Sequence, residues 1–179
     1  MMNKFFAACL IGAAVFMTGC LDDSADLNEN NPKAAQAMTK SIPNFNATDL
    51  NGNSVTKEIF ASKKITVLNI WGTFCPPCIG EMPELGEMAR NMPADAQLVG
   101  LICDAEEGSS QIQDAKKILR DAGANFVNII PDEKLFQFLN DVEAVPTTIF
   151  VNSKGEIIGQ AIVGADVEGY KDELARLLK

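Results

Sequence analysis

The hydrophobic positions of this chain alternate between short, nearly continuous apolar runs and longer stretches where apolar residues recur every three or four positions. Two runs, KKITVLNIW (residues 63–71) and QLVGLIC (97–103), have the length and the β-branched or apolar content of strands buried on both faces. Between them, residues 76–92 carry apolar side chains at helical spacing. We therefore predict two central strands joined by a crossover helix.

The remainder of the chain continues this alternation. In chain order, the other predicted elements are a hairpin over 45–55, a helix from the cap candidates Ser109 and Ser110 to Gly123, a strand over 125–130, a short helix over 132–140, two strands within 147–164 and a final helix capped by Asp166. Helices between apolar strands indicate right-handed crossovers, and the closing pair of strands indicates an antiparallel edge. The predicted class is α/β with a mixed sheet.

The first forty residues follow a different pattern. Residues 1–19 combine Lys4 with an uncharged apolar run and end in small residues, which is typical of a secretory signal peptide. The MTGC sequence that ends at Cys20 resembles a bacterial lipobox, which implies that Cys20 is lipidated and becomes the mature N-terminus. The alternative is a soluble secreted protein in which Cys20 is incidental. Residues 20–40 are poor in large apolar side chains and predict a flexible tether, leaving one domain over 41–179.

Composition and charge narrow the function classes. The 179 residues are 47% hydrophobic and 22% charged, an ordinary balance for a globular domain. Fifteen basic and twenty-four acidic residues give a net charge of −9, and the lysines are scattered singly or in pairs. This field repels phosphate backbones, so we expect no nucleic-acid partner.

The cysteines limit the chemistry further. Of five cysteines, Cys9 is lost with a signal peptide and Cys20 is used by a lipid, which leaves Cys75, Cys78 and Cys103. A structural zinc site needs four nitrogen or sulfur ligands, and the chain has no histidine. A purely structural bridge across so short a loop removes little unfolded-state entropy. We therefore expect no metal and no cofactor other than a redox-active disulfide between Cys75 and Cys78.

The stretch WGTFCPPC places its two cysteines at a strand-to-helix junction. Cys75 comes before the first helical turn, where unpaired N–H groups and the helix dipole stabilise a thiolate, so we expect it to be the nucleophile. Cys78 lies about one turn further on and can resolve a mixed disulfide with a substrate. Pro76 suits the first helical position because its missing N–H is not needed there.

The longer segment VLNIWGTFCPPCIGEMPEL resembles the active-site segment of thioredoxin-fold proteins, specifically the membrane-anchored TlpA/ResA-type thiol-disulfide oxidoreductases. The resemblance covers roughly residues 42–179 and implies a thioredoxin-like fold with an added N-terminal β-hairpin and a helical insert after the third strand. It also implies a helix kink at Pro83 and a cis Pro146 in the VPTT loop, with the backbone of Val145 pairing with substrate. The alternative for Pro146 is an ordinary proline at the start of a strand.

Further site residues are expected around the cysteine pair. Thioredoxin has a buried aspartate where this chain has Asn69, and an amide cannot carry the proton of the resolving thiol. Glu81 lies three residues after Cys78, and the resemblance also places a glutamate there, so we expect it to shuttle that proton; the alternative is a residue that only complements the helix dipole. Cys103 is either a third redox thiol or a small buried hydrophobe. The residues expected to contact substrate are Trp71, Phe74, Pro76, Pro77, Val145 and Pro146.

These features predict a monomeric thiol-disulfide oxidoreductase on the outer side of the bacterial cytoplasmic membrane, in the periplasm if the cell is diderm. We expect the domain to be held to the membrane by a lipid anchor and to act as a reductant of protein disulfides, with apocytochrome c as one candidate substrate. A membrane thiol donor would supply its electrons. One rival is a redoxin-type thiol peroxidase, although Gly72 stands where such enzymes resemble one another in a threonine. The other is a non-catalytic binding lipoprotein on a thioredoxin scaffold.

Overall fold

The computed structural model describes residues 41–179, so the predicted signal peptide (1–19), the lipidation site Cys20 and the tether (20–40) lie outside the described residues. The strands are β1 (Asn46–Asp49), β2 (Ser54–Thr56), β3 (Ile65–Trp71), β4 (Ala96–Ile102), β5 (Val127–Ile130), β6 (Thr147–Asn152) and β7 (Ile157–Val163). The helices are η2 (Lys57–Ser62), a 3₁₀ helix, and α1 (Pro76–Arg90), α2 (Gln111–Asp121), α3 (Glu133–Leu139) and α4 (Val167–Leu178).

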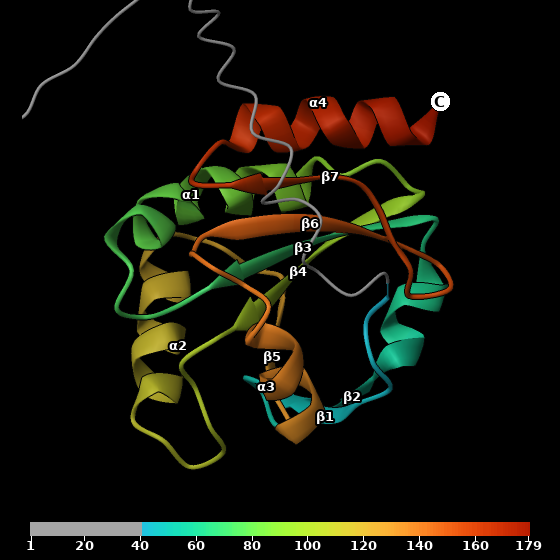
Figure 1. Cartoon of the computed structure of the whole chain (residues 1–179). Helices are drawn as coiled ribbons and strands as arrows, with labels where there is room; N and C mark the ends of the chain where they lie inside the picture. Colours follow the sequence, from blue (N-terminus) through green and yellow to red (C-terminus); the bar gives the residue numbers. More distant parts are fainter. Residues whose placement is uncertain (1–40) are drawn as a thin grey trace, which may run out of the picture. The chain divides into compact units, whose positions relative to one another are not determined.

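The strands form one mixed sheet in the order β2-β1-β5-β4-β3-β6-β7, which can be followed from β7 down to β1 and β2 in Figure 1. β3 is parallel to β4 and antiparallel to β6, and all seven of its residues are buried. A strand covered on both faces must be apolar almost throughout, which is why the run in 63–71 is nearly continuous. The prediction of two central strands joined by a crossover helix is confirmed.

Two hydrophobic clusters cover the two faces of the sheet. One contains Val67 and Trp71 of β3 with residues of α1, α2 and α4, and the other contains Leu68 and Ile70 with residues of η2 and α3. Because side chains alternate along a strand, Asn69 belongs to the same face as Val67 and Trp71. The single polar residue in the middle of β3 therefore faces the side that α1 and α4 cover.

The predicted hairpin is present and extends the sheet. β1 pairs with β2 and also, antiparallel, with β5, so the hairpin forms one edge. The Asp49 carboxylate accepts the backbone N–H groups of Asn51 and Asn53, and Gly52 in the turn has φ 83°. Such a positive φ favours glycine. The predicted helical insert after the third strand of the core corresponds to α3.

One predicted cap is wrong. Ser110 precedes α2, but it already has helical dihedral angles (φ −65°, ψ −28°) and its side chain makes no capping bond. The side chain of an N-cap reaches the helix when its backbone is extended. The hydroxyl of Ser109 instead accepts the backbone N–H of Glu106 in the preceding turn. Asp132 and Asp166 do cap α3 and α4 through their carboxylates.

The two edges of the sheet are irregular or short. β2 has three residues, and the pairing of β6 with β7 shifts register between Thr148 and Phe150. Gly159 in β7 has φ 68°, a left-handed conformation that interrupts a regular strand. Within residues 41–179, none of the helices combines the length and the apolar character that a bilayer crossing requires.

Candidate active site

The cysteine pair lies where β3 ends and α1 begins. Cys75 and Cys78 are joined by a disulfide with their Cα atoms 5.3 Å apart, and they are 4% and 0% exposed. Cys75 is the N-cap of α1, with an extended backbone, and its sulfur accepts the backbone N–H of Cys78 at 3.3 Å. Pro76 occupies the first helical position. The predicted location of Cys75 before the first helical turn is confirmed.

A carboxylate holds the loop that leads to Cys75. The backbone N–H of Thr73 donates to Asp104 Oδ1 at 3.0 Å, and the Thr73 hydroxyl donates to Oδ2 at 2.6 Å. A Cβ added at Gly72 would lie 2.7 Å from the ring of the exposed Phe74 and 3.1 Å from Cys103 Sγ, so a larger residue here would displace the Phe74 side chain. Sequence reasoning missed Asp104. The sequence could have indicated it, because Asp104 comes two residues after β4, and the carboxyl end of β4 lies beside that of β3, where α/β folds place their sites.

A second loop meets the disulfide from the β6 side. The Val145–Pro146 peptide bond is cis, as the family resemblance implied. The Val145 carbonyl oxygen lies 3.5 Å from Cys75 Sγ, and Gly164 donates its N–H to the Pro146 carbonyl at 2.8 Å. The structure therefore brings Val145 and Pro146 together with the cysteine pair.

Behind the disulfide lies a buried cluster of polar side chains from four elements. Asn69 Nδ2 donates to Glu81 Oε1 at 3.0 Å and to Thr148 Oγ1 at 3.0 Å. The Tyr170 hydroxyl lies 3.0 Å from Glu81 Oε2 and 2.6 Å from the Gly164 carbonyl oxygen. Glu81 is 4% exposed, and the other three side chains are fully buried. We call Asn69, Glu81, Thr148 and Tyr170 the polar cluster.

The electrostatics of the polar cluster shift the titration of Glu81 to higher pH than in water. Burial raises the pKa of Glu81, hydrogen bonds from Asn69 and Tyr170 oppose that rise, and the nearby charge of Glu84 adds to it. Within the described part of the chain, the interactions that shift the pKa of Glu81 include no positive charge. Burial also raises the pKa of Tyr170 to about 12, so its hydroxyl keeps its hydrogen at neutral pH. The arrangement can therefore hold and release a proton close to Cys78, one helical turn away on α1.

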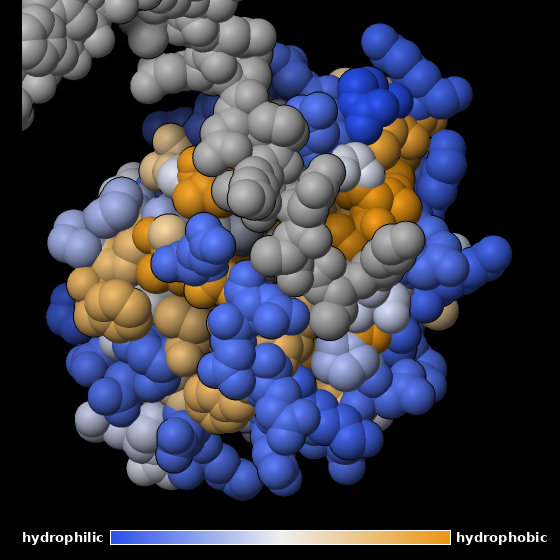
Figure 2. All heavy atoms as spheres, viewed as in Figure 1, coloured by the Kyte–Doolittle hydropathy of each residue, from blue (hydrophilic) through white to orange (hydrophobic). Residues whose placement is uncertain are grey.

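The surface around the disulfide is apolar. Phe74 is 66% exposed, Pro76 and Pro77 are exposed, and Val163 at the end of β7 is 61% exposed. Figure 2 shows apolar surface at the left of the view, where Figure 1 places the loop between β3 and α1. A cluster of exposed apolar side chains of this kind is typical of a contact site for another molecule.

Trp71 differs from our expectation that it contacts substrate. It is fully buried, and its Nε1–H donates to the Asn128 side chain at 2.9 Å. The physical reason is strand alternation, since Trp71 ends β3 on the face that α1 covers. Trp71 belongs to the hydrophobic cluster that also contains Cys75 and Cys78, and it does not reach the surface.

Cys103 is a free, half-buried thiol beside the same loop. Burial and the charge of Asp104 raise the pKa of Cys103 to about 11. A thiol with such a pKa is protonated at neutral pH and is a poor nucleophile. This favours the interpretation of Cys103 as a small buried hydrophobe.

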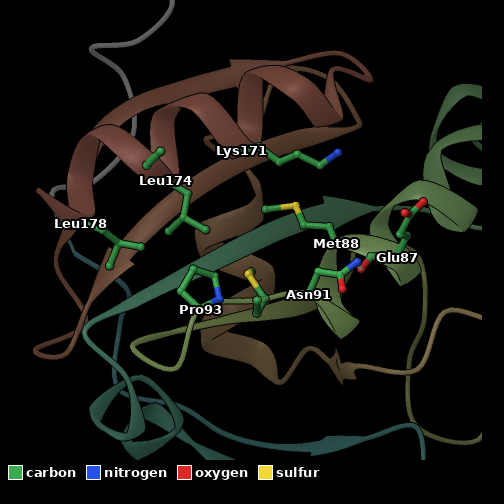
Figure 3. A pocket seen from close by; sticks show the side chains of 9 residues that line it. Glu87, Met88, Asn91, Pro93, Lys171, Leu174 and Leu178 are labelled. Atoms are coloured by element: carbon green, nitrogen blue, oxygen red, sulfur yellow. Dashed lines mark hydrogen bonds between the residues drawn. The ribbon is translucent and has the colours of Figure 1, made fainter.

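A hollow of about 280 Å³ lies elsewhere, between the C-terminal half of α1 and α4. Figure 3 shows Met88, Leu174 and Leu178 around it, with Glu87 and Lys171 near its rim. Its lining includes neither Cys75 nor Cys78. The disulfide chemistry therefore takes place at an apolar surface away from this hollow.

Comparisons with known proteins agree with this geometry. The model of the Redoxin family matches residues 37–178. The thiol-disulfide oxidoreductase ResA of Bacillus thuringiensis subsp. konkukian is 30% identical over 141 residues, which cover 78% of this chain and 76% of the relative. The thiol:disulfide interchange protein DsbE of Haemophilus influenzae is 32% identical over 120 residues, covering 66% and 62%. In structure, the chain is similar to a putative DsbE of Chlorobium tepidum, with a TM-score of 0.64, 24% identity and coverage of 79% and 99%.

Proposed function

Because the chain belongs to the Redoxin family and is a thioredoxin-like thiol-disulfide oxidoreductase of the TlpA/ResA type, we propose that it reduces disulfides of other proteins in the bacterial cell envelope through Cys75 and Cys78. The observation that carries this proposal is the Cys75–Cys78 disulfide at the N-terminus of α1, beside the Val145–Pro146 loop.

The reaction proceeds in two exchanges. In the reduced protein, the Cys75 thiolate attacks one sulfur of a substrate disulfide, a bond forms between Cys75 and that sulfur, and the other substrate sulfur leaves as a thiolate and takes up a proton. The Cys78 thiolate then attacks Cys75 Sγ, the Cys75–Cys78 bond forms, and the second substrate sulfur leaves. Two electrons pass to the substrate. The structure holds the resulting oxidised state, which a membrane thiol donor must reduce again.

Glu81 serves the second exchange. Cys78 must lose its proton before it can attack, and the Glu81 carboxylate on the same face of α1 takes that proton up. Asn69 has no ionisable proton to transfer, and the hydrogen bond that its amide group donates orients Glu81. In this role Glu81 is the proton acceptor and Asn69 is its positioning residue.

The apolar surface around the disulfide selects the substrate. The backbone of Val145 pairs with an extended substrate segment, and Phe74, Pro76, Pro77 and Pro146 contact the residues that flank its cysteine. Unfolded chains expose apolar residues next to cysteines, and apocytochrome c before haem attachment is one substrate of this kind. A lipid on Cys20 and a tether over 20–40 hold the domain at the membrane, where its thiol donor resides.

The test is a trapping experiment combined with an insulin-disulfide reduction assay. Cys78→Ser should accumulate mixed disulfides through Cys75, because the nucleophile still attacks while the resolving thiol is gone. Cys75→Ser should trap little and lose insulin reduction, and Cys103→Ala is the matched control that should behave as the unmodified protein. Better trapping by Cys75→Ser would reverse the two roles. Peroxide turnover without insulin reduction would point to a peroxidase, and no thiol activity would point to a binding protein.

A further inference from the structure

The Tyr170 hydroxyl lies in the polar cluster and faces more hydrogen-bond acceptors than its single hydrogen can bond at once. It accepts the backbone N–H of Asp166 at 3.2 Å, and it has a side-chain hydrogen bond with Thr148. Two acceptors also face it, the Gly164 carbonyl oxygen at 2.6 Å and Glu81 Oε2 at 3.0 Å. A hydroxyl has one hydrogen to donate, so Gly164 and Glu81 compete for it.

The outcome of this competition depends on the proton of Glu81. A neutral Glu81 carries its own hydrogen and leaves the Tyr170 hydrogen to the Gly164 carbonyl, which can only accept. An ionised Glu81 is acceptor-only, and a buried carboxylate that lacks a donor is costly. Asn69 supplies one donor to Oε1, and Tyr170 is the donor available to Oε2.

We propose that Tyr170 is a positioning residue that moves its single hydroxyl hydrogen from the Gly164 carbonyl to Glu81 when Glu81 gives up its proton. This inference rests on the proposed role of Glu81 as the proton acceptor for Cys78. By stabilising the carboxylate, Tyr170 sets the pH at which Glu81 becomes able to take up the Cys78 proton. Tyr170 acts through Glu81 and has no contact with the disulfide in this role.

The other groups around Glu81 do not stabilise its carboxylate at Oε2, where Tyr170 can donate a hydrogen bond. Asn69 on β3 and Thr148 on β6 are neutral, and Glu84 on α1 adds negative charge. Asp166 at the start of α4 uses its carboxylate to cap Gly169. Among residues 41–179, no cation takes part in the interactions that shift the titration of Glu81.

The switch is also connected to the substrate loop. Gly164, whose carbonyl competes for the Tyr170 hydrogen, donates its own N–H to the Pro146 carbonyl at 2.8 Å. A change in the hydrogen bond to the Gly164 carbonyl therefore occurs on the residue that is itself hydrogen-bonded to Pro146 in the substrate loop. The Gly164 amide is a natural reporter of the switch.

The experiment compares Tyr170→Phe with the unmodified protein in the full chain. The pH dependence of the Cys78-dependent resolution of a mixed disulfide with an insulin peptide is measured, and Glu81 is titrated through its carboxyl carbon NMR signal, identified by its loss in Glu81→Gln. We expect Tyr170→Phe to move both midpoints to higher pH by about one unit, because the carboxylate loses one hydrogen bond. The Gly164 amide signal should titrate with the same midpoint in the unmodified protein only.

Two controls separate this role from a structural one. Thr66→Val removes a buried hydroxyl of β3 that accepts a hydrogen bond from Gln97. Thr66 faces the opposite side of the sheet from Asn69, so this variant should leave both midpoints in place. In a Glu81→Gln background, adding Tyr170→Phe should leave the pH profile unchanged, because the residue through which Tyr170 acts is absent.

The single tyrosine of the chain provides a second variant that keeps the shape of the core. Growth on 3-fluorotyrosine labels Tyr170 alone and makes its hydroxyl a stronger donor, so the Glu81 midpoint should move to lower pH, and the fluorine signal should titrate with it. Unmoved Glu81 midpoints in both variants would overturn the inference even if insulin is reduced normally. A protein that reduces no insulin but shows the expected Glu81 shifts would overturn the proposed function and retain the role of Tyr170.

Discussion

Helices α1 and α4 make two contacts of opposite character. Near the disulfide the contact is a hydrogen bond between Glu81 and Tyr170, both buried. Towards the other end of α1 it consists of apolar side chains, with Met88 and Leu174 each 4% exposed beside the hollow of Figure 3. Apolar burial stabilises the fold by an amount that does not depend on protonation. A buried carboxyl group contributes an amount that changes with pH.

The comparison shows how one helix pair serves two purposes. The apolar contact fixes α1 against α4, and the polar contact places a titratable group behind Cys78. If both polar side chains were replaced by apolar ones of similar shape, we expect little change in the stability of the fold, and the proposed proton acceptor would be lost. The three predictions below test this division, beginning with the largest expected effect.

Leu174→Ala should weaken the apolar contact and lower the free energy of unfolding by about 2–4 kcal/mol. The side chain is almost fully buried in the larger hydrophobic cluster, so its removal leaves a cavity. Urea denaturation at several pH values measures the change. Met88→Leu, which nearly conserves volume, is the matched control and should cost less than about 1.5 kcal/mol. A loss that varied strongly with pH would contradict the assignment of this contact as purely apolar.

Glu81→Gln should remove a pH dependence of stability that comes from the polar contact. The folded-state pKa of Glu81 is raised above its ordinary value of 4.5, so the native state binds more protons than the unfolded state between these two values. Stability of the unmodified protein therefore falls as pH rises through this window, with a slope of at most about 1.4 kcal/mol per pH unit.

The measurement is the difference in unfolding free energy between Glu81→Gln and the unmodified protein, taken in steps from pH 4 to 9. We expect the variant to gain relative stability as the pH rises above 4.5, the ordinary pKa of the group. Glu87→Gln, a change of the same kind on an exposed position of α1 whose charge is not among the causes of the Glu81 shift, is the control and should show little trend. A constant difference over the whole range would mean that burial does not penalise the Glu81 carboxylate.

The smallest effect is expected on the outer surface of α4. Arg176 pairs with Glu173 through two hydrogen bonds of 2.6 Å and 2.7 Å, and the arginine side chain is exposed. The Glu173 side chain is only 10% exposed, but it also accepts the backbone N–H of Gln160 and keeps that partner when Arg176 is removed. Solvent screens such a pair, so Arg176→Ala should shift the melting temperature by less than about 2 °C. A shift as large as that of Leu174→Ala, followed by calorimetry, would show that α4 depends on its surface charges more than on its apolar face.

The sequence predicted the central elements well because their signals are local. The apolar runs of β3 and β4 and the helical spacing of α1 lie within single segments, and their bounds agree with the structure to within two residues. The CPPC motif at the start of α1 was found for the same reason, and the position of Glu81 on that helix follows from local spacing, while its role in proton transfer stays a prediction. Asp166 as a cap required only its position before the apolar face of α4.

The partners of Glu81 could not be predicted because they depend on the order of strands. Tyr170 is 89 residues from Glu81, and Thr148 is 79 residues from Asn69. They meet because β6 lies beside β3 and α4 packs on the same face as α1. Tyr170 also fits the apolar stripe of α4, where an aromatic ring indicates core packing and says nothing about its hydroxyl. Trp71 was misplaced for a simpler reason, since alternation along β3 was not applied to its last residue.

The short or irregular edges of the sheet limit the addition of an extended chain from another protein as a further strand. A long, flat edge strand is a template on which any extended chain can add itself, and repeated addition leads to aggregates. Here β2 offers three residues and β7 is interrupted by Gly159 and a register shift, so neither edge presents a long, regular ladder of free backbone groups. If the enzyme acts on extended segments of other proteins, as we propose, these short and irregular edges disfavour the addition of such segments to its sheet.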